Sequence, residues 1–294
     1  MSNVKQFISL LLFIVIPVSV HAKDLKPNIS GKFDVGGFSL YLECYGTQQP
    51  TVVLESGFGG YGSNGLWNKV ITEVSPDSQV CVYDRAGLGR SDAGPVPFSS
   101  KDVAERLHGL LATAEINEPF ILVSHSYGSY HLKMFNALYG ESVLAALFVD
   151  PTPFGLMKFS AENWPAPSSS DTQEVIEFRS NDRKAYFDPS DNPETMDFEK
   201  SYEEVASAND FGAKPLIVIK ATREIEPWGD WARDLPPEVE ERNRAFLTES
   251  DELFLALSEN SEVITAETTE HNIHWHEPKI VIENLRALIN KVSR

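Results

Sequence analysis

Basic residues are scarce in this 294-residue sequence, which has 25 lysines and arginines against 43 aspartates and glutamates. The formal net charge at pH 7 is −18. A protein of this sign is repelled by nucleic acid and by anionic membrane surfaces before any contact forms. The charge balance therefore argues against both kinds of partner and is typical of an acidic soluble surface.

Cysteine is also rare, because Cys44 and Cys81 are the only two in the sequence. An even pair is compatible with one disulfide if the chain reaches an oxidising compartment. No internal repeat is visible. The sequence alone leaves the pairing open, because it depends on the topology of the fold.

Long apolar runs are absent after the first 22 residues. That first segment has one basic residue, Lys5, then an apolar run from Phe7 to Val20 and a small residue at Ala22, which is typical of a secretory signal peptide. The run is shorter than the ~20 residues of a membrane-spanning helix, and Pro17 interrupts it. We predict that residues 1–22 are cleaved after Ala22, leaving a periplasmic or secreted protein without a membrane span.

Short apolar runs alternate with longer segments of helical periodicity through the rest of the chain. This pattern predicts a mostly parallel sheet covered by helices on both faces, built around one large core. A two-residue Gly36-Gly37 turn predicts that the first two strands form an antiparallel hairpin. Strands are expected at Lys32–Val35, Phe38–Tyr45, Thr51–Glu55, Gln79–Tyr83, Phe120–Ser124, Leu144–Asp150, Pro215–Ala221 and Glu262–Ala266.

Two helices are predicted from apolar stripes, at Lys101–Ala114 and Pro278–Asn290. Ser99 and Asp102 form a capping-box signal at the start of the first of them. We interpret both stripes as core-packing surfaces.

Residues 151–213 break the alternation, because they are rich in proline, serine, acidic and aromatic residues. A structureless loop of this length is uncommon in a compact domain. We therefore expect a partly helical cap inserted after the sixth strand, with residues 23–150 and 214–294 forming the core domain.

A candidate nucleophile lies at Ser126, where an apolar strand meets a sharp turn and a helical pattern begins. A nucleophile on such a turn needs small residues two positions away on either side, and Ser124 and Gly128 meet this need. Ser124 itself is disfavoured because Leu122 would then occupy one of the small positions. The alternative that Ser126 only caps the following helix is disfavoured by the strand-turn-helix context.

A serine hydroxyl needs a base to accept its proton, and an imidazole suits that task near neutral pH. We predict His271, which comes soonest after the last strand. His125 lies in the turn itself, and we expect it to point away from the nucleophile. His274 and His276 follow in the same loop as His271 and suggest a zinc site, but the spacing fits no structural zinc pattern, so we interpret both as loop packing or the edge of a pocket. We expect no metal and no cofactor.

Two carboxylates compete to orient the histidine. Asp150 ends the sixth strand directly before the cap, and Glu224 follows the seventh strand after a short loop. Side chains at the carboxyl ends of parallel strands point into the site, so either carboxylate is placed where it can orient the histidine. Asp150 needs less loop to place it, although an Asp-Pro turn would also explain it.

Backbone N–H groups are the expected donors to the oxyanion of an acyl-transfer intermediate. Tyr127, directly after the candidate nucleophile, would supply one donor. Phe58 or Gly57, in the glycine-rich segment Glu55–Gly60, would supply the other. A dinucleotide site is disfavoured because no G-x-G-x-x-G helix start follows that strand.

Together these residues resemble the α/β-hydrolase superfamily, in particular bacterial members with V-V-L-E-S-G-x-G-G and Y-D-R-x-G-x-G-x-S segments. These segments stand here at Val52–Gly60 and Tyr83–Ser91. The resemblance covers most of the mature chain outside the cap. It implies the α/β-hydrolase fold, a triad of Ser126, His271 and Asp150, and a structural role for the loop that contains Asp84 and Arg85.

Two residues depart from the family pattern: Ser124 stands for the usual glycine of the elbow, and Ser56 stands where many relatives carry histidine. The family strand order also places the second strand beside the fourth. The resemblance thus implies that Cys44 and Cys81 lie within reach of one another.

The predicted activity is that of a serine hydrolase that cleaves a small carboxylic ester or related acyl substrate through an acyl-enzyme. An aminopeptidase, an acyltransferase, a C–C hydrolase and a non-catalytic binding protein of the same fold are the alternatives. Epoxide hydrolase and dehalogenase chemistry is disfavoured, because those enzymes use a carboxylate where this chain has Ser126.

Overall fold

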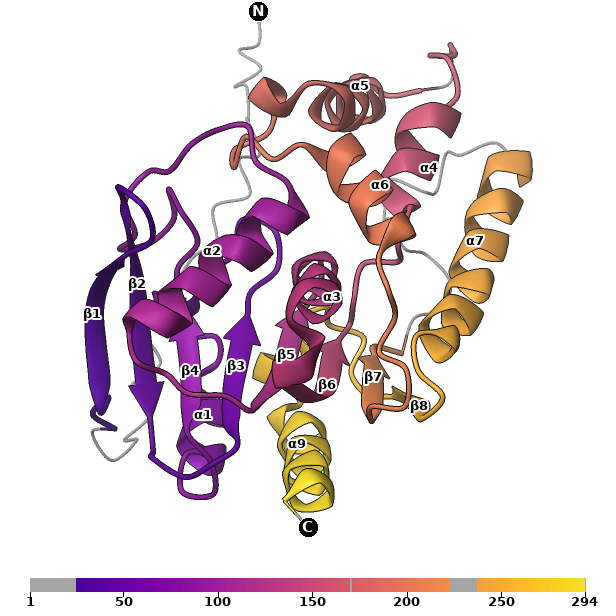
Figure 1. Cartoon of the computed structure of the whole chain (residues 1–294). Helices are drawn as coiled ribbons and strands as arrows, with labels where there is room; N and C mark the ends of the chain where they lie inside the picture. The colour runs from indigo at the N-terminus through magenta and orange to yellow at the C-terminus, as the bar shows by residue number, and fades with distance from the viewer. Residues whose placement is uncertain (1–24, 170, 223–236, 294) are drawn as a thin grey trace, which may run out of the picture.

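The computed structural model describes residues 25–169, 171–222 and 237–293. Within them, eight strands form one sheet in the order β1-β2-β4-β3-β5-β6-β7-β8 (Figure 1). The pairs β1–β2 and β2–β4 are antiparallel, and all later pairs are parallel. The predicted eight-stranded, mostly parallel fold is confirmed. The strands are β1 (Ile29–Asp34), β2 (Ser39–Tyr45), β3 (Thr51–Glu55), β4 (Val80–Tyr83), β5 (Phe120–His125), β6 (Val143–Val149), β7 (Leu216–Lys220) and β8 (Ser261–Thr265).

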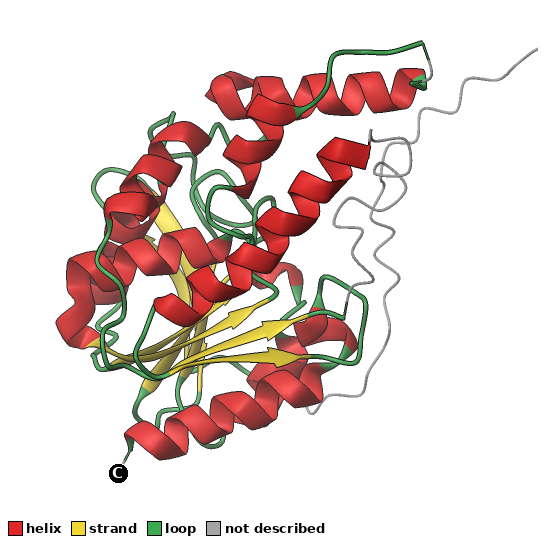
Figure 2. Ribbon diagram, turned by 90° about the vertical axis from the view of Figure 1, so that its right-hand side faces the viewer, coloured by secondary structure: helices red, strands yellow, loops and turns green. Residues whose placement is uncertain are grey.

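Helices cover both faces of the sheet (Figure 2). One apolar core lies between the sheet and α2, α3, α6 and α7, and a second lies between the opposite face and α1 and α9. The helices are α1 (Asn68–Val74), α2 (Ser100–Thr113), α3 (Gly128–Tyr139), α4 (Leu156–Asn163), α5 (Gln173–Phe187), α6 (Phe198–Ser207), α7 (Pro237–Ala256), α8 (Ile273–His276) and α9 (Pro278–Val292), with 3₁₀ turns η1 (Gly62–Asn64), η2 (Gly140–Ser142) and η3 (Pro189–Asp191). None of the helices in this part of the chain is long and apolar enough to cross a bilayer.

The N-terminal hairpin turns at Gly36 and Gly37, whose φ angles of 111° and 97° lie in the region that favours glycine. β1 begins at Ile29, three residues before the predicted start at Lys32, because the antiparallel register continues to the Ile29–Cys44 pair. Its side chains alternate between half-buried and exposed, so the strand has no continuous apolar run to mark it in the sequence.

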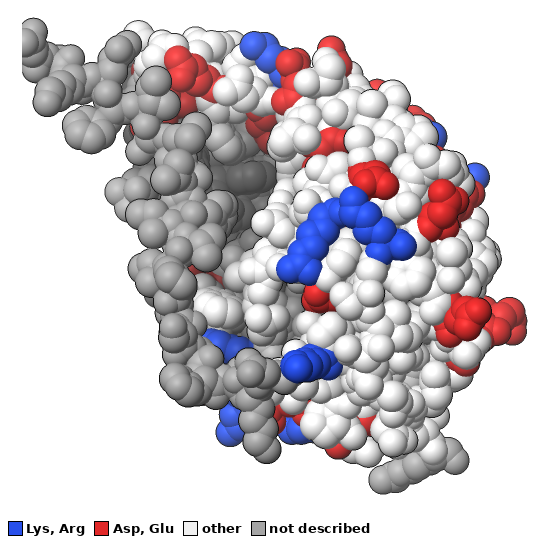
Figure 3. All heavy atoms as spheres, turned by 90° about the vertical axis from the view of Figure 1, so that its left-hand side faces the viewer, with Lys and Arg blue, Asp and Glu red and all other residues white. Residues whose placement is uncertain are grey.

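The exposed edge of the sheet carries charged side chains. Figure 3 views the molecule from the β1 side, where basic and acidic groups lie next to one another. Lys32 Nζ lies 2.6 Å from Asp92 Oδ1, and Arg90 Nη1 lies 3.0 Å from Glu43 Oε1. Charges on an edge strand discourage pairing with a second sheet.

The predicted capping box at α2 is present. The Ser99 side chain accepts a hydrogen bond from the Asp102 N–H, and the Ser99 N–H donates to Asp102 Oδ2 at 2.7 Å. This exchange satisfies two backbone donors that the first turn of a helix otherwise leaves without partners.

After β6 the chain leaves the sheet, forms α4, α5 and α6, and then returns to β7; we refer to residues 151–213 as the cap (Figure 1). Phe98 and Met196 form a parallel bridge between core and cap, and the Asp197 N–H donates to Phe98 O at 2.8 Å. Backbone hydrogen bonds therefore fix the C-terminal part of the cap to the core.

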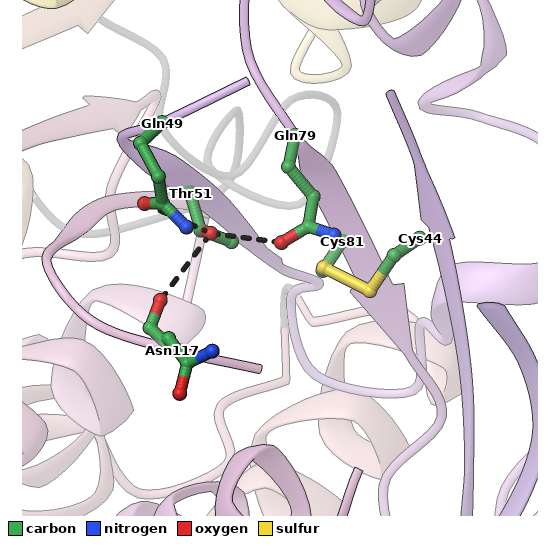
Figure 4. The surroundings of a disulfide bond; sticks show 6 residues. All are labelled: Cys44, Gln49, Thr51, Gln79, Cys81 and Asn117. Carbon is green, nitrogen blue, oxygen red and sulfur yellow. Dashed lines mark hydrogen bonds between the residues drawn. A yellow bond between two sulfur atoms is a disulfide. The ribbon is translucent and has the colours of Figure 1, made fainter. Parts of the chain in front are cut away.

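Cys44 and Cys81 face one another across the β2–β4 ladder and form a disulfide (Figure 4). Their Cα atoms are 4.1 Å apart, and neither residue is exposed to solvent. Nearby, the Thr51 hydroxyl donates to Gln79 Oε1 at 2.9 Å. The disulfide thus joins the antiparallel part of the sheet to the strand that begins its parallel part.

The double substitution Cys44→Ala/Cys81→Ala removes a link between residues 37 positions apart. A crosslink that closes a loop of this size lowers the entropy of the unfolded chain, which predicts a loss of about 4 kcal/mol in the free energy of unfolding. Urea unfolding of the wild type and the variant, both without reductant, measures this loss in the free energy of unfolding. A loss below about 1 kcal/mol would contradict the chain-entropy account.

Candidate active site

Ser126 lies on a sharp turn between β5 and α3, and its φ of 52° is in the left-handed region that non-glycine residues rarely adopt. Its N–H donates to Val149 O at 3.0 Å, which ties it to the end of the neighbouring strand β6. A side chain at Gly128 would come within 2.8 Å of Glu55 Cγ, so glycine is needed at that position. The geometry is that of a nucleophile elbow.

Asp150 and His271 form a hydrogen-bonded pair. His271 Nδ1 lies 2.5 Å from Asp150 Oδ2, and the other carboxylate oxygen accepts from the Ala221 N–H at 3.2 Å. The Asp150 side chain is buried, whereas the imidazole is about half exposed. Since a carboxylate only accepts, His271 carries its proton on Nδ1. Glu224, the alternative acid, lies outside the described residues.

The Ser126 hydroxyl pairs with Thr152 in this structure, with 3.2 Å between the two oxygen atoms. Within the described residues it makes no hydrogen bond to His271. The structure therefore joins two of the three predicted triad residues directly. It brings the third to the end of the adjacent strand.

His125 and His274 flank His271; the sequence predicted loop packing or a pocket-edge position for His274 and no part in the site for His125. The His125 ring lies 4.4 Å from the His271 ring and 4.7 Å from the His274 ring, centroid to centroid. His125 Nε2 donates to the backbone oxygen of His271 at 3.1 Å. His125 is the last residue of β5, and the end of β5 meets the loop that carries His271. A role for His125 in the site could have been predicted from that meeting.

His274 is buried and stacks on Trp67 with 4.1 Å between ring centroids. Burial, with the nearby His271 and His276, lowers the pKa of His274 to about 3. Its imidazole is therefore neutral at pH 7 and serves as a flat packing surface beneath the loop that carries His271.

A glycine-rich turn passes against the elbow. A side chain at Gly57 would come within 2.8 Å of Ser126 Cβ, so only a glycine lets the backbone approach this closely. Gly60 N donates to Gly57 O at 3.0 Å, and Gly59 has a φ of 72°. Across the described part of the chain, the N–H groups of Tyr127, Phe58 and Gly57 donate no hydrogen bond, so the predicted first donor and both alternatives for the second are available.

A buried ionic cluster lies behind this turn. Arg85 Nη1 is 2.6 Å from Glu55 Oε1, and Arg85 Nη2 is 2.8 Å from Glu194 Oε1. His131 Nδ1 donates to Glu55 Oε1 at 3.0 Å, and Tyr83 donates to the other oxygen of Glu55. None of these five side chains is more than 4% exposed.

The cluster keeps the Glu55 carboxylate ionised. Burial alone would raise the pKa of Glu55, but Arg85 and His131 outweigh it and hold that pKa below its usual value. Burial likewise disfavours the charged form of Arg85, and the two glutamates outweigh it and raise its pKa. The loop of Arg85 has the structural role that the resemblance implied, and Glu194 is an added member that no sequence pattern indicated.

No group of three or more histidine, cysteine, aspartate or glutamate side chains among the described residues is arranged to hold a metal ion. His274 packs against Trp67, and His276 is exposed. Among the described residues, the candidate site offers a hydroxyl, an imidazole–carboxylate pair and backbone N–H groups.

The sequence model of the alpha/beta hydrolase family matches residues 52–284. The chain therefore belongs to the alpha/beta hydrolase family. The matched range spans the elbow, the glycine-rich turn and the loop that carries His271.

The chain is 26% identical over 237 residues to the "Uncharacterized protein YqjL" of Bacillus subtilis, which covers 80% of this chain and 82% of that protein. A thermophilic esterase from Thermogutta terrifontis is similar in structure, with a TM-score of 0.55, 18% identity, and coverage of 90% of this chain and 99% of the esterase. The epoxide hydrolase CorEH matches with a TM-score of 0.55, 13% identity, and coverage of 90% and 99%. Structural likeness at such low identity shows the fold.

The pKa of His274 predicts a pH-dependent stability. Between its ordinary pKa of 6.5 and its folded value of about 3, the unfolded chain binds a proton that the folded chain excludes. The free energy of unfolding should therefore fall as the pH drops below 6.5, and His274→Phe should remove this part of the loss while keeping a ring on Trp67. Urea unfolding at pH 7 and pH 5 measures both slopes.

His276→Phe is the comparison variant, because His276 is exposed and contributes less to the lowered pKa of His274 than burial and His271 do, so most of the pH dependence should remain. Equal slopes for wild type and His274→Phe would show that His274 takes up its proton in the folded state.

Proposed function

We propose that this protein is a serine hydrolase that cleaves a carboxylic ester or related acyl substrate, with Ser126 as nucleophile, His271 as base and Asp150 as the orienting acid. The observation that carries the proposal is the 2.5 Å contact between His271 Nδ1 and Asp150 Oδ2 beside a left-handed serine. A strained serine after one strand, and an imidazole whose tautomer is fixed by a buried carboxylate after the adjacent strand, are the groups that acyl transfer uses.

In the first half of the reaction, the Ser126 hydroxyl leaves Thr152 by rotation about its Cα–Cβ bond and attacks the acyl carbon. Because Asp150 holds the proton of His271 on Nδ1, Nε2 is the basic nitrogen that accepts the serine proton. The carbonyl oxygen becomes an oxyanion that the N–H groups of Phe58 and Tyr127 stabilise. His271 then protonates the leaving group, which departs and leaves an acyl-enzyme.

In the second half, His271 Nε2 takes a proton from water, and the hydroxide attacks the acyl carbon. The tetrahedral intermediate collapses, the proton returns to Ser126, and the carboxylic acid leaves. Every proton in this cycle moves on chain residues or water, so the proposed reaction uses no cofactor.

The serine at the elbow also separates the candidate chemistries of the fold. Epoxide hydrolases attack with a carboxylate, whereas the corresponding position here is Ser126. A hydroxyl that forms an acyl-enzyme favours ester cleavage, and peptide, acyl-transfer and C–C bond substrates would use the same triad. The oxyanion donors support acyl chemistry against a non-catalytic binding role.

A fluorophosphonate probe tests the proposal, because it bonds covalently to an activated serine. Labelling of wild type should map to Ser126 and be lost in Ser126→Ala and His271→Ala. Ser124→Ala is the matched control, since Ser124 is fully buried two residues away and should leave labelling intact. Asp150→Asn should lower kcat on p-nitrophenyl butyrate by about 10³- to 10⁴-fold, because the wrong histidine tautomer is favoured.

Absence of labelling in folded wild-type protein would reject the hydrolase proposal and favour a binding protein. Labelling that persists in His271→Ala would mean that another group activates the serine.

We also propose that the protein is exported. The sequence of residues 1–22 supports this, although that segment lies outside the described residues, and the buried disulfide is of the kind that persists in oxidising compartments. Expression of the full chain in a bacterial host, followed by N-terminal sequencing of periplasmic material, should give a chain that starts at Lys23. Recovery of the uncleaved chain from the cytoplasm alone would reject export.

A further inference from the structure

Glu194 belongs to the cap, between η3 and α6, yet its side chain reaches the glycine-rich turn of the core. Glu194 Oε1 accepts the Gly59 N–H at 2.5 Å and Arg85 Nη2 at 2.8 Å, and Glu194 Oε2 accepts Arg85 Nε at 3.0 Å. Only 1% of its side chain is exposed. A carboxylate from the inserted segment is thus buried against the backbone that supplies a proposed oxyanion donor.

Arg85 holds that donor from the other side of the peptide. Its guanidinium donates to Ser56 O at 2.7 Å and to Gly57 O at 2.8 Å. The C=O of Gly57 and the N–H of Phe58 belong to one trans peptide group, in which the two bonds point in opposite directions. Fixing the oxygen of Gly57 toward Arg85 therefore fixes the Phe58 N–H away from Arg85.

The next peptide group is held as well, because its N–H, that of Gly59, donates to Glu194. Phe58 thus lies between two anchored peptides, one held through its oxygen by Arg85 and one held through its hydrogen by Glu194. An oxyanion donor stabilises the developing charge only when it lies within a few tenths of an ångström of its best hydrogen-bonding position. The two restraints on Phe58 therefore affect the rate of the proposed reaction directly.

Charge balance explains why both anchors are needed. The Arg85 guanidinium forms a two-oxygen contact with Glu194 and a separate contact with Glu55, and all three side chains are buried. Removing one partner from a buried pair leaves charge without compensation, and the neighbouring groups rearrange. Without Glu194, the guanidinium would be drawn toward Glu55, and the carbonyl of Gly57 would move with it.

We propose that Glu194 is a positioning residue for the oxyanion hole: the cap supplies the carboxylate that, through Arg85 and Gly59, sets the direction of the Phe58 N–H. This inference rests on the proposed function. It makes the proposed chemistry of the core depend on a side chain contributed by the inserted segment.

A role limited to docking the cap is the competing explanation, and Glu204 offers the matched control. Glu204 lies on α6 and also joins cap to core, since Ser99 Oγ donates to its Oε1 at 3.0 Å and the Lys101 N–H donates to its Oε2 at 3.1 Å. It has no contact with the glycine-rich turn among the described residues. Glu204→Gln therefore weakens docking without touching Phe58.

The experiment compares Glu194→Gln, Glu194→Ala and Glu204→Gln in hydrolysis of p-nitrophenyl butyrate and in inhibition by an alkyl trifluoromethyl ketone, whose adduct carries an oxyanion. We expect kcat to fall about tenfold in Glu194→Gln and about 100-fold in Glu194→Ala, as expected for a displaced oxyanion donor. KM should stay within about threefold, and the inhibition constant should rise in parallel with the loss of kcat. Glu204→Gln should match wild type in kcat, in KM and in the inhibition constant.

If a Glu194 variant does not fold, Arg85→Lys provides the same test. An ammonium keeps the charge but cannot contact Gly57 O, Glu55 and Glu194 together, so the same loss of kcat is expected. A changed KM with unchanged kcat, or equal losses in Glu194→Gln and Glu204→Gln, would overturn the proposal.

The failure of the underlying function gives a different result. If wild type neither reacts with the fluorophosphonate nor hydrolyses the ester, the hydrolase proposal falls and this inference falls with it. If wild type reacts and the Glu194 variants keep full kcat, the hydrolase proposal stands and only the role of Glu194 is rejected.

Discussion

Two left-handed residues at adjacent strand ends are the constraint on which the site depends. Ser126 and Asp150 have φ values of 52° and 43°, and each such conformation costs about 1–3 kcal/mol. Ser126 directly follows β5, and Asp150 directly follows β6. Each of these two strands pairs with a neighbouring strand on both sides. The Ser126 N–H bonds to Val149 O, so the ladder itself holds the two turns next to each other. The strain is thus stored directly after two strands that are paired on both sides.

A second layer of organisation surrounds this edge. His125 and His274 flank the ring of His271, and the neutral, buried His274 gives the last loop a flat surface on Trp67. The buried ionic cluster around Arg85 supports the glycine-rich turn, because Arg85 donates hydrogen bonds to its backbone oxygens. The proposed base and the proposed oxyanion donors are therefore supported by different kinds of contact, one by ring packing and one by charge and hydrogen bonds.

Local rules explain what the sequence could predict. A strand end, a turn and small flanking residues mark Ser126, and an acid directly after a strand marks Asp150, because these features need only a few neighbouring residues. The support of the site has no such local signature. Glu194 meets Gly59 across 135 positions, and the bond from His125 to the loop of His271 crosses 146. Contacts of this range depend on how the cap and the last loop pack, which periodicity does not encode.

Thr152 lies at the start of the cap and Glu194 lies between η3 and α6, and both touch the candidate site: Thr152 pairs with the serine hydroxyl, and Glu194 holds the glycine-rich turn. The chain between them, with α4 and α5, is anchored at its two ends by contacts to the candidate site. Evolution can therefore lengthen, shorten or rewrite this middle stretch while both anchors stay in place. Relatives can diverge there in what they admit to the site and still share the same chemistry.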